Sequence, residues 1–155
     1  MTDKLLQISN LDIVLPEGSE RDLAVKDLNI DLSPGETLCI VGESGSGKSL
    51  TARALMGLLP APHVRVEKGT ISFCGEDLTK ASEPRMRQIR GSEISMIFQE
   101  PMSSLNPLHT VVRQISESLI VHRKMSRALA RERALELLKL VGIADPESRL
   151  DSYPH

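Results

Sequence analysis

The stretch that most limits how this chain can fold is CIVGESGSGKSLTARALMGLL, residues 39–59. Apolar β-forming residues come first, then a run with three glycines and a lysine, then helix formers. A packed core has no need for three glycines beside a lysine, because glycine is used where the backbone is unusual or closely approached. A phosphate chain bound by backbone N–H groups does need them. The stretch therefore predicts a strand, a phosphate-binding loop and a helix, in that order.

Residues 42–49 match the pattern G-x-x-x-x-G-K-[ST]. The N–H groups at the helix start should converge on phosphate oxygens, and the helix dipole should strengthen the attraction. Lys48 supplies a mobile positive charge for the β- and γ-phosphates, and Ser49 offers a hydroxyl ligand to Mg²⁺. The expected nucleotide-binding residues are Gly42, Glu43, Ser44, Gly45, Ser46, Gly47, Lys48, Ser49 and Leu50. A plain Gly-Ser turn with a solvated lysine is the alternative, and the strand and helix patterns on either side argue against it.

Composition restricts the class of protein. The chain has 155 residues, enough for one modest domain, and a formal net charge of −2. It lacks an apolar run of about 18 residues and a signal-peptide pattern, so we expect a cytoplasmic protein with no transmembrane segment. Few aromatic residues and a balanced charge disfavour a nucleic-acid partner. Cys39 and Cys74 lie in apolar, strand-like runs and are expected to be buried, reduced thiols.

Hydrophobic periodicity predicts the other elements. Alternation favours strands over residues 5–14 and 23–32, with a loop at 15–22 between them. Continuous apolar runs at residues 37–41 and 94–98 are typical of strands buried on both faces. The remaining expectations are a short strand at 70–73 and helices at 50–58, 82–90, 111–121 and from a Ser126 cap to a stop at Gly142, with Val141 on the apolar face. An α/β part thus precedes a mainly helical part.

The phosphate loop alone does not separate transport ATPases, GTPases and small-molecule kinases. The Asp-x-x-Gly and Asn/Thr-Lys-x-Asp strings of GTPases do not occur in the sequence. A kinase would need a lid of arginines, and Arg85, Arg87 and Arg90 are the candidates. An exposed helix face explains these three arginines better.

Two motifs together carry a more specific resemblance. VGESGSGKS, followed later by ISMIFQEPMSSLNP, resembles the nucleotide-binding domain of ABC transporters, in particular the peptide/nickel importer branch. FQEPMSSLNPLHT and the closing SYPH are especially similar to the ATP-binding subunits that serve microcin C and oligopeptide import. The resemblance runs from about residue 5 to residue 155.

The resemblance implies an α/β fold: a P-loop NTPase with a RecA-like core and an antiparallel β subdomain, followed by the start of a helical subdomain. The implied division is residues 1–105 for the ATP-binding core and 106–155 for the helical part. Gln99 matches the family's loop glutamine, which contacts Mg²⁺ and the attacking water. Glu100 is interpreted as loop structure, because the strand before a catalytic glutamate should end in an Asp rather than in Gln99.

The implied function is an ATP-binding subunit that couples ATP binding and hydrolysis to the import of peptides or related solutes. The implied cofactors are ATP and Mg²⁺. The implied partners are permease subunits in the membrane, a second ATP-binding domain in a head-to-tail dimer and, indirectly, a periplasmic solute-binding protein. The protein would then be peripheral, on the cytoplasmic side of the inner membrane.

Two features depart from the family pattern. The aromatic residue that stacks on adenine would fall at or near Leu15, and the first aromatic residue of the chain is Phe73. The signature, the Walker B Asp, the catalytic Glu and the switch His do not occur before the chain ends in LDSYPH. We therefore expect the 155-residue chain to be truncated, to hydrolyse no ATP alone, and to expose the apolar runs at 37–41 and 94–98.

Two interpretations besides the transport ATPase stay open. The first is a remnant that binds nucleotide without hydrolysing it. An ABC-type ATPase of DNA repair or translation is the second, and the sequence lacks the long insertions and basic stretches usual in that class.

Overall fold

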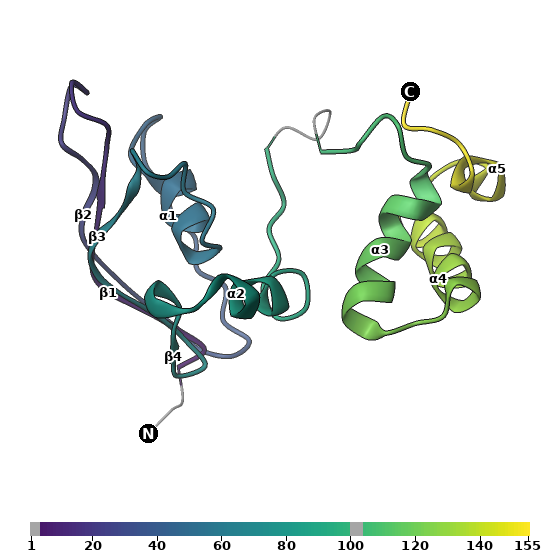
Figure 1. Ribbon diagram of the computed structural model, residues 1–155, viewed down its shortest axis with the longest axis horizontal. Helices are drawn as coiled ribbons and strands as arrows, with labels where there is room; N and C mark the ends of the chain where they lie inside the picture. Colours follow the sequence, from purple (N-terminus) through teal and green to yellow (C-terminus); the bar gives the residue numbers. More distant parts are fainter. Residues whose placement is uncertain (1–3, 100–103) are drawn as a thin grey trace. The chain divides into compact units, whose positions relative to one another are not determined.

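The computed structural model describes residues 4–99 and 104–155. Contacts between Cα atoms divide the chain into two compact units, Met1–Arg87 and Gln88–His155. The first unit holds an antiparallel sheet and helix α1, and the second holds helices α3, α4 and α5 (Figure 1). The division at residue 105 that the family resemblance implies remains a prediction.

The sheet of the first unit has four strands in the order β2-β1-β3-β4, and all neighbours are antiparallel (Figure 1). The strands are β1 Leu6–Val14, β2 Leu23–Leu32, β3 Arg65–Phe73 and β4 Glu76–Asp77. The strands predicted at residues 5–14 and 23–32 are therefore confirmed, as is the loop between them. The third strand begins earlier than its predicted start at residue 70.

Strand β1 changes its buried face in mid-course. The register with β2 shifts between Ile8 and Leu11, and Asn10 adopts a φ of 49°. The N–H of Asn10 donates to Asn29 Oδ1 at 2.9 Å, so the irregularity has a hydrogen-bond partner across the pair. A bulge of this kind lets Ile8, Leu11 and Ile13 all reach the core, where each is at most 3% exposed.

Gly69 in β3 yields a prediction about stability. A Cβ atom at Gly69 would lie 2.5 Å from Asn10 O and 2.6 Å from Leu11 Cα, and φ there is 94°. We expect Gly69→Ala to lower the free energy of unfolding of the full protein by about 3 kcal/mol, from backbone strain and overpacking. Gly75 is the matched control, because its φ is 84° but a Cβ atom would meet nothing within 4 Å. Equal losses for Gly69→Ala and Gly75→Ala in chemical denaturation would contradict the steric explanation.

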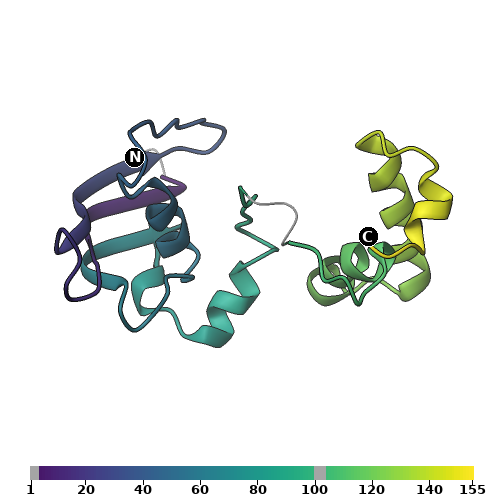
Figure 2. The same cartoon turned by 90° about the horizontal axis from the view of Figure 1, so that it is seen from above.

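Helix α1 spans Lys48–Leu55 and lies along one face of the sheet (Figures 1 and 2). It is shorter than the predicted 50–58. Gly57 has a φ of 61°, and the N–H of Leu58 donates back to Arg53 O at 2.8 Å, which ends the helix. Leu58, predicted on the apolar face, is consequently 40% exposed. The short helices 3₁₀ η1 Leu78–Lys80 and α2 Glu83–Ile89 follow the sheet.

The second unit contains α3 Val111–Arg123, α4 Arg127–Leu140 and α5 Pro146–Leu150. Both predicted ends of α4 are confirmed: Ser126 accepts a hydrogen bond from Leu129 N at 3.3 Å, and Gly142 has a φ of 75° just beyond the helix. Val141 does not join the apolar face and is 68% exposed. The core of this unit consists of Ala134, Leu138 and Leu150, with Val111, Val112, Ile115 and Leu135 packed against it.

Two ion pairs tie α5 and the residues just after it to α4. Arg131 donates two hydrogen bonds to Asp151, at 2.6 and 2.5 Å, and Lys139 lies 2.7 Å from Glu147. The hydrogen-bonded guanidinium of Arg131 holds the pKa of the Asp151 carboxyl below its usual value. Since this pair is exposed, it fixes the position of the chain end more than it adds to stability.

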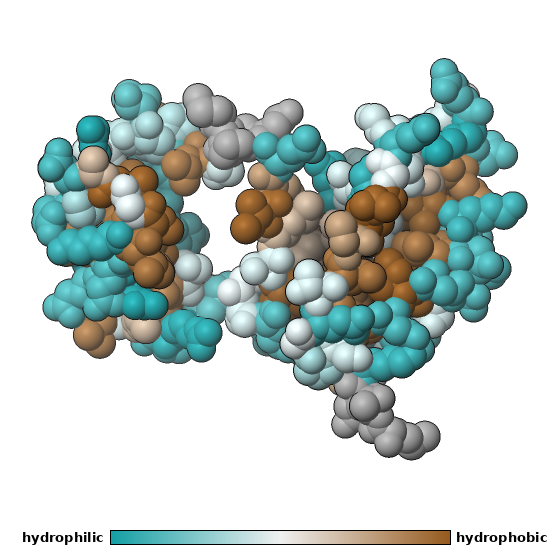
Figure 3. Space-filling view, turned by 180° about the vertical axis from the view of Figure 1, so that it is seen from behind, coloured by the Kyte–Doolittle hydropathy of each residue, from teal (hydrophilic) through white to brown (hydrophobic). Residues whose placement is uncertain are grey.

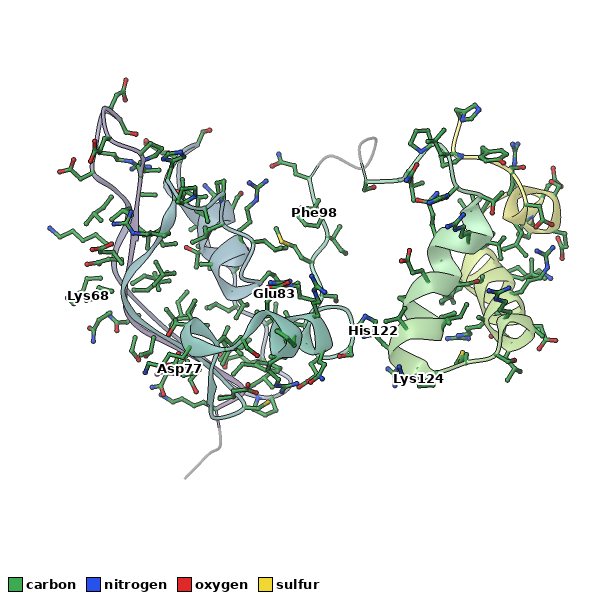
Figure 4. The ribbon with its side chains drawn as sticks, viewed as in Figure 1. Lys68, Asp77, Glu83, Phe98, His122 and Lys124 are labelled. Atoms are coloured by element: carbon green, nitrogen blue, oxygen red, sulfur yellow. The ribbon has the colours of Figure 1, made fainter. Side chains whose placement is uncertain are left out.

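The two strands predicted to be buried on both faces do not form. Residues 37–41 and 94–98 contain no strand, although Ile94 makes an isolated parallel bridge to Arg90. Val41 is 83% exposed and Ile97 is 99% exposed. Phe98, labelled in Figure 4, follows Ile97 on the second of these segments. A parallel strand forms only when its backbone pairs with another strand, and among the described residues no strand pairs with either run. The expected exposure of apolar residues is confirmed, and apolar side chains reach the surface in both units (Figure 3).

The expectation for the two cysteines is wrong in one respect. Both are free thiols, but both are exposed rather than buried. Cys39 is exposed because its segment has no strand partners, and Cys74 lies in the turn between β3 and β4 with a φ of 49°. As for membrane insertion, none of the helices within the described ranges is long and apolar enough to cross a bilayer.

Candidate functional site

The phosphate loop, residues 42–49, curls into the start of α1. Gly45 and Gly47 adopt φ values of 80° and 93°, which side chains with a Cβ atom disfavour. Inside the loop, Ser46 N donates to Glu43 O at 3.2 Å. At its end, Gly47 O accepts from both the N–H and the hydroxyl of Thr51, at 2.8 and 3.1 Å. The loop is thus anchored to the first turn of the helix.

Gly47 also anchors the loop to the sheet. A Cβ atom there would lie 2.6 Å from Val25 Cγ2 and 2.7 Å from Ala24 O, so the backbone of Gly47 packs directly on β2. Gly42 is constrained from inside the loop, since its Cβ atom would lie 2.8 Å from Ser46 Oγ. Gly42 and Gly47 are therefore required because a Cβ atom would clash with neighbouring atoms. Gly45 and Gly47 are required by their positive φ angles.

Lys48 folds back over the loop. Its ammonium group donates to Gly42 O and Glu43 O at 2.7 Å each, and to Ser46 Oγ at 3.2 Å. The first turn of α1 begins at the same residue, and the N–H groups of a first turn have no partners within the helix. One ammonium group and a set of backbone donors thus gather at one place, which is the arrangement that binds a phosphate chain.

The donor set near Lys48 suits Mg²⁺ held mainly by phosphate and water. Ser49 is exposed on the first turn of α1, and its hydroxyl bonds to no other group in the described ranges. Those ranges also contain no group of three or more His, Cys, Asp or Glu residues that could hold a metal. A single exposed hydroxyl, that of Ser49, fits Mg²⁺, which keeps several waters and takes few protein ligands.

Arg21 is a residue of the site that the sequence reasoning did not identify. Its Nη2 atom donates to the backbone carbonyl of Gly45, within the phosphate loop. The residue lies in the loop between β1 and β2, which is closed by a hydrogen bond from Leu15 N to Asp22 O at 2.8 Å. A breaker-rich loop with mixed charge gave no sign of this contact, because the contact joins segments distant in sequence.

The other predicted site residues lie elsewhere. Gln99 is exposed at the end of the extended segment and belongs to the second compact unit, whereas the phosphate loop belongs to the first. Glu100 lies outside the described residues. Leu15, expected near the adenine, is partly exposed at the end of β1.

Two of the three arginines considered for a kinase lid, Arg85 and Arg87, are engaged with carboxylates of their own unit. Arg85 donates to both carboxylate oxygens of Glu76, between 2.8 and 3.1 Å, and this bond lowers the pKa of Glu76. Arg87 lies 3.4 Å from Glu83 on the same helix. These contacts favour the interpretation as an ordinary helix surface.

Comparison with known sequences gives consistent matches along the chain. A family model described as ABC transporter matches residues 25–155. The chain is 49% identical over 154 residues to the peptidoglycan transport ATP-binding protein YejF of Agrobacterium fabrum, which covers 99% of this chain and 28% of that protein. It is 48% identical to the dipeptide transport ATP-binding protein DppD of Bacillus subtilis, covering 99% of this chain and 46% of DppD. The chain thus spans less than half the length of these relatives.

Solved structures agree with the sequence matches. The ATP-binding cassette MJ0796, in a dimeric post-hydrolysis state bound to ADP and Pi, superposes with a TM-score of 0.81 at 26% identity. The match covers 96% of this chain and 61% of the cassette. A second dimeric structure of MJ0796, titled a bacterial ABC transporter cassette, superposes with a TM-score of 0.79.

Proposed function

This chain belongs to the ABC transporter family, and from that membership we propose that it is the phosphate-binding part of an ATP-driven peptide importer. One observation carries the proposal: Lys48 and the first-turn N–H groups of α1 meet over a glycine loop that is packed on β2. The names of the relatives supply the solute class, since they describe transport of dipeptides and of peptidoglycan.

We assign the roles within the site as follows. Backbone N–H groups between Gly45 and Leu50 bind the phosphate oxygens, and Lys48 contacts the β- and γ-phosphates. Ser49 and Gln99 are the proposed ligands of Mg²⁺, which neutralises charge on those phosphates when bound. Gln99 also orients the attacking water, because its neutral amide accepts a hydrogen bond without adding charge.

Hydrolysis and transport are proposed for the full protein that carries these residues. Its proposed partners are membrane permease subunits and a second ATP-binding domain in a head-to-tail pair, with a periplasmic solute-binding protein acting indirectly. The dimeric state of the cassette MJ0796 supports the pairing of ATP-binding domains. The proposed location is the cytoplasmic side of the inner membrane. By itself the 155-residue chain should hydrolyse no ATP, because the signature, the Walker B Asp and the catalytic Glu do not occur in it.

The test is titration of the full protein with Mg-ATP in a calorimeter. We expect saturation with a Kd at or below about 1 mM. The preference for ATP over GTP should be weaker than in a protein that has an aromatic residue at the position of Leu15. Lack of binding at millimolar Mg-ATP would end the proposal. Binding with no turnover in the assembled transporter would instead favour the alternative, a non-hydrolysing nucleotide-binding remnant.

A further inference from the structure

Arg21 is held beside the phosphate loop by structure on both sides of the contact. Its own loop is closed by the Leu15–Asp22 hydrogen bond, and Ser19 bonds twice to Pro16 O, through N at 3.2 Å and Oγ at 2.7 Å. Directly after the loop, β2 carries Ala24 and Val25 against Gly47. The guanidinium therefore reaches Gly45 from a segment that is fixed relative to the phosphate loop.

The contact fixes the orientation of one peptide unit. In a trans peptide the C=O and the N–H of the unit point to opposite sides. Because Arg21 holds the carbonyl of Gly45, the N–H of Ser46 points away from Arg21, and it donates to Glu43 O at 3.2 Å. Glu43 O is also one of the oxygens that bind the ammonium group of Lys48. The N–H of Ser46 and the ammonium group of Lys48 thus share one acceptor, Glu43 O.

We propose that Arg21 is a positioning residue of the nucleotide site, which acts from outside the phosphate loop. It fixes the Gly45–Ser46 peptide, whose N–H closes the turn of the phosphate loop on Glu43 O, and its charge favours the anion. Arg21 is the one base among residues 15–22, which also contain Glu17, Glu20 and Asp22, so its replacement leaves this loop with negative charge alone. The inference rests on the proposed function, since it names a further residue of the same site.

The experiment replaces Arg21 in the full protein and measures Mg-ATP affinity. Arg21→Ala and Arg21→Gln should each weaken binding about tenfold, because the peptide loses its anchor and the anion loses a nearby charge. Arg21→Lys should recover most of the affinity, since an ammonium group also donates to a carbonyl. The slope of log Kd against log salt should become shallower in Arg21→Gln and should be retained in Arg21→Lys, which a purely structural role would not produce.

Arg65→Gln is the matched control. Arg65 is an exposed arginine of β3 that pairs with Glu67 at 2.8 Å, so its replacement removes the same charge from the same unit without touching the loop. The proposal is overturned if Arg21→Gln binds Mg-ATP within twofold of Arg65→Gln, or if Arg21→Lys is as weak as Arg21→Ala. In either outcome the unmodified protein still binds Mg-ATP, whereas failure of the proposed function would remove binding from the unmodified protein itself.

Discussion

Lys48→Ala should weaken Mg-ATP binding by the full protein by about a hundredfold or more, equivalent to roughly 2.7 kcal/mol. The ammonium group of Lys48 belongs to the phosphate loop itself, where it contacts Gly42 O, Glu43 O and Ser46 Oγ. A triphosphate provides stronger, negatively charged acceptors for the same group. Without Lys48 the backbone N–H groups remain, but most of the charge compensation for the phosphates is lost. Calorimetric titration measures the change directly.

Lys68→Ala controls for the loss of a surface lysine. Lys68 is exposed on β3 and is labelled in Figure 4. We expect this variant to bind Mg-ATP as the unmodified protein does. Both variants should unfold within about 1 kcal/mol of the unmodified protein, because surface substitutions have small effects on stability. If Lys48→Ala retained affinity within threefold, the ammonium group would not be part of the nucleotide site.

Val41→Ser and Ile97→Ser should affect stability very differently in the short chain and in the full protein. In the 155-residue chain these side chains are 83% and 99% exposed, so the substitutions should leave the free energy of unfolding nearly unchanged and reduce aggregation. In the full protein we expect both runs to be strands of a parallel sheet, buried on both faces. There each substitution should cost about 2–4 kcal/mol, from lost burial and an added hydroxyl group.

Chemical denaturation of the full protein and sedimentation of the short chain measure the two effects. Ile13→Ser is the control, since Ile13 is fully buried in the sheet of the first unit and its replacement should destabilise both forms. Should Val41→Ser and Ile97→Ser leave the full protein as stable as before, the two apolar runs would not be core strands. A cooperative, high-temperature melt of the unmodified short chain would contradict the expectation that it is poorly stable.

Local patterns in the sequence predicted the elements that depend on nearby residues. Alternation in β1 and β2 was sufficient because these strands are neighbours in the chain and pair through a short loop. Ser126 and Gly142 marked the ends of α4 because capping involves residues within one turn. The phosphate loop was recognisable for the same reason: its glycines, Lys48 and the start of α1 are contiguous.

Errors arose where the outcome depends on residues far away. The end of α1 before Leu58 follows from a Gly57 turn, but the exposure of Val41, Ile97 and Cys39 follows from missing strand neighbours. Composition reports that a segment suits a buried strand, and it carries no information on whether partner strands are present. The contact of Arg21 with Gly45 is of the same kind, since it joins two loops that the packing of Gly47 on β2 brings together.

The residues alone therefore establish a phosphate-binding loop between an apolar run and a helix, because that motif is short, contiguous and set by backbone angles. Folding in three dimensions settled which apolar runs became strands and which distant arginine reached the loop. Both outcomes depend on hydrogen bonds between segments, and such bonds form only where a complementary backbone lies within reach.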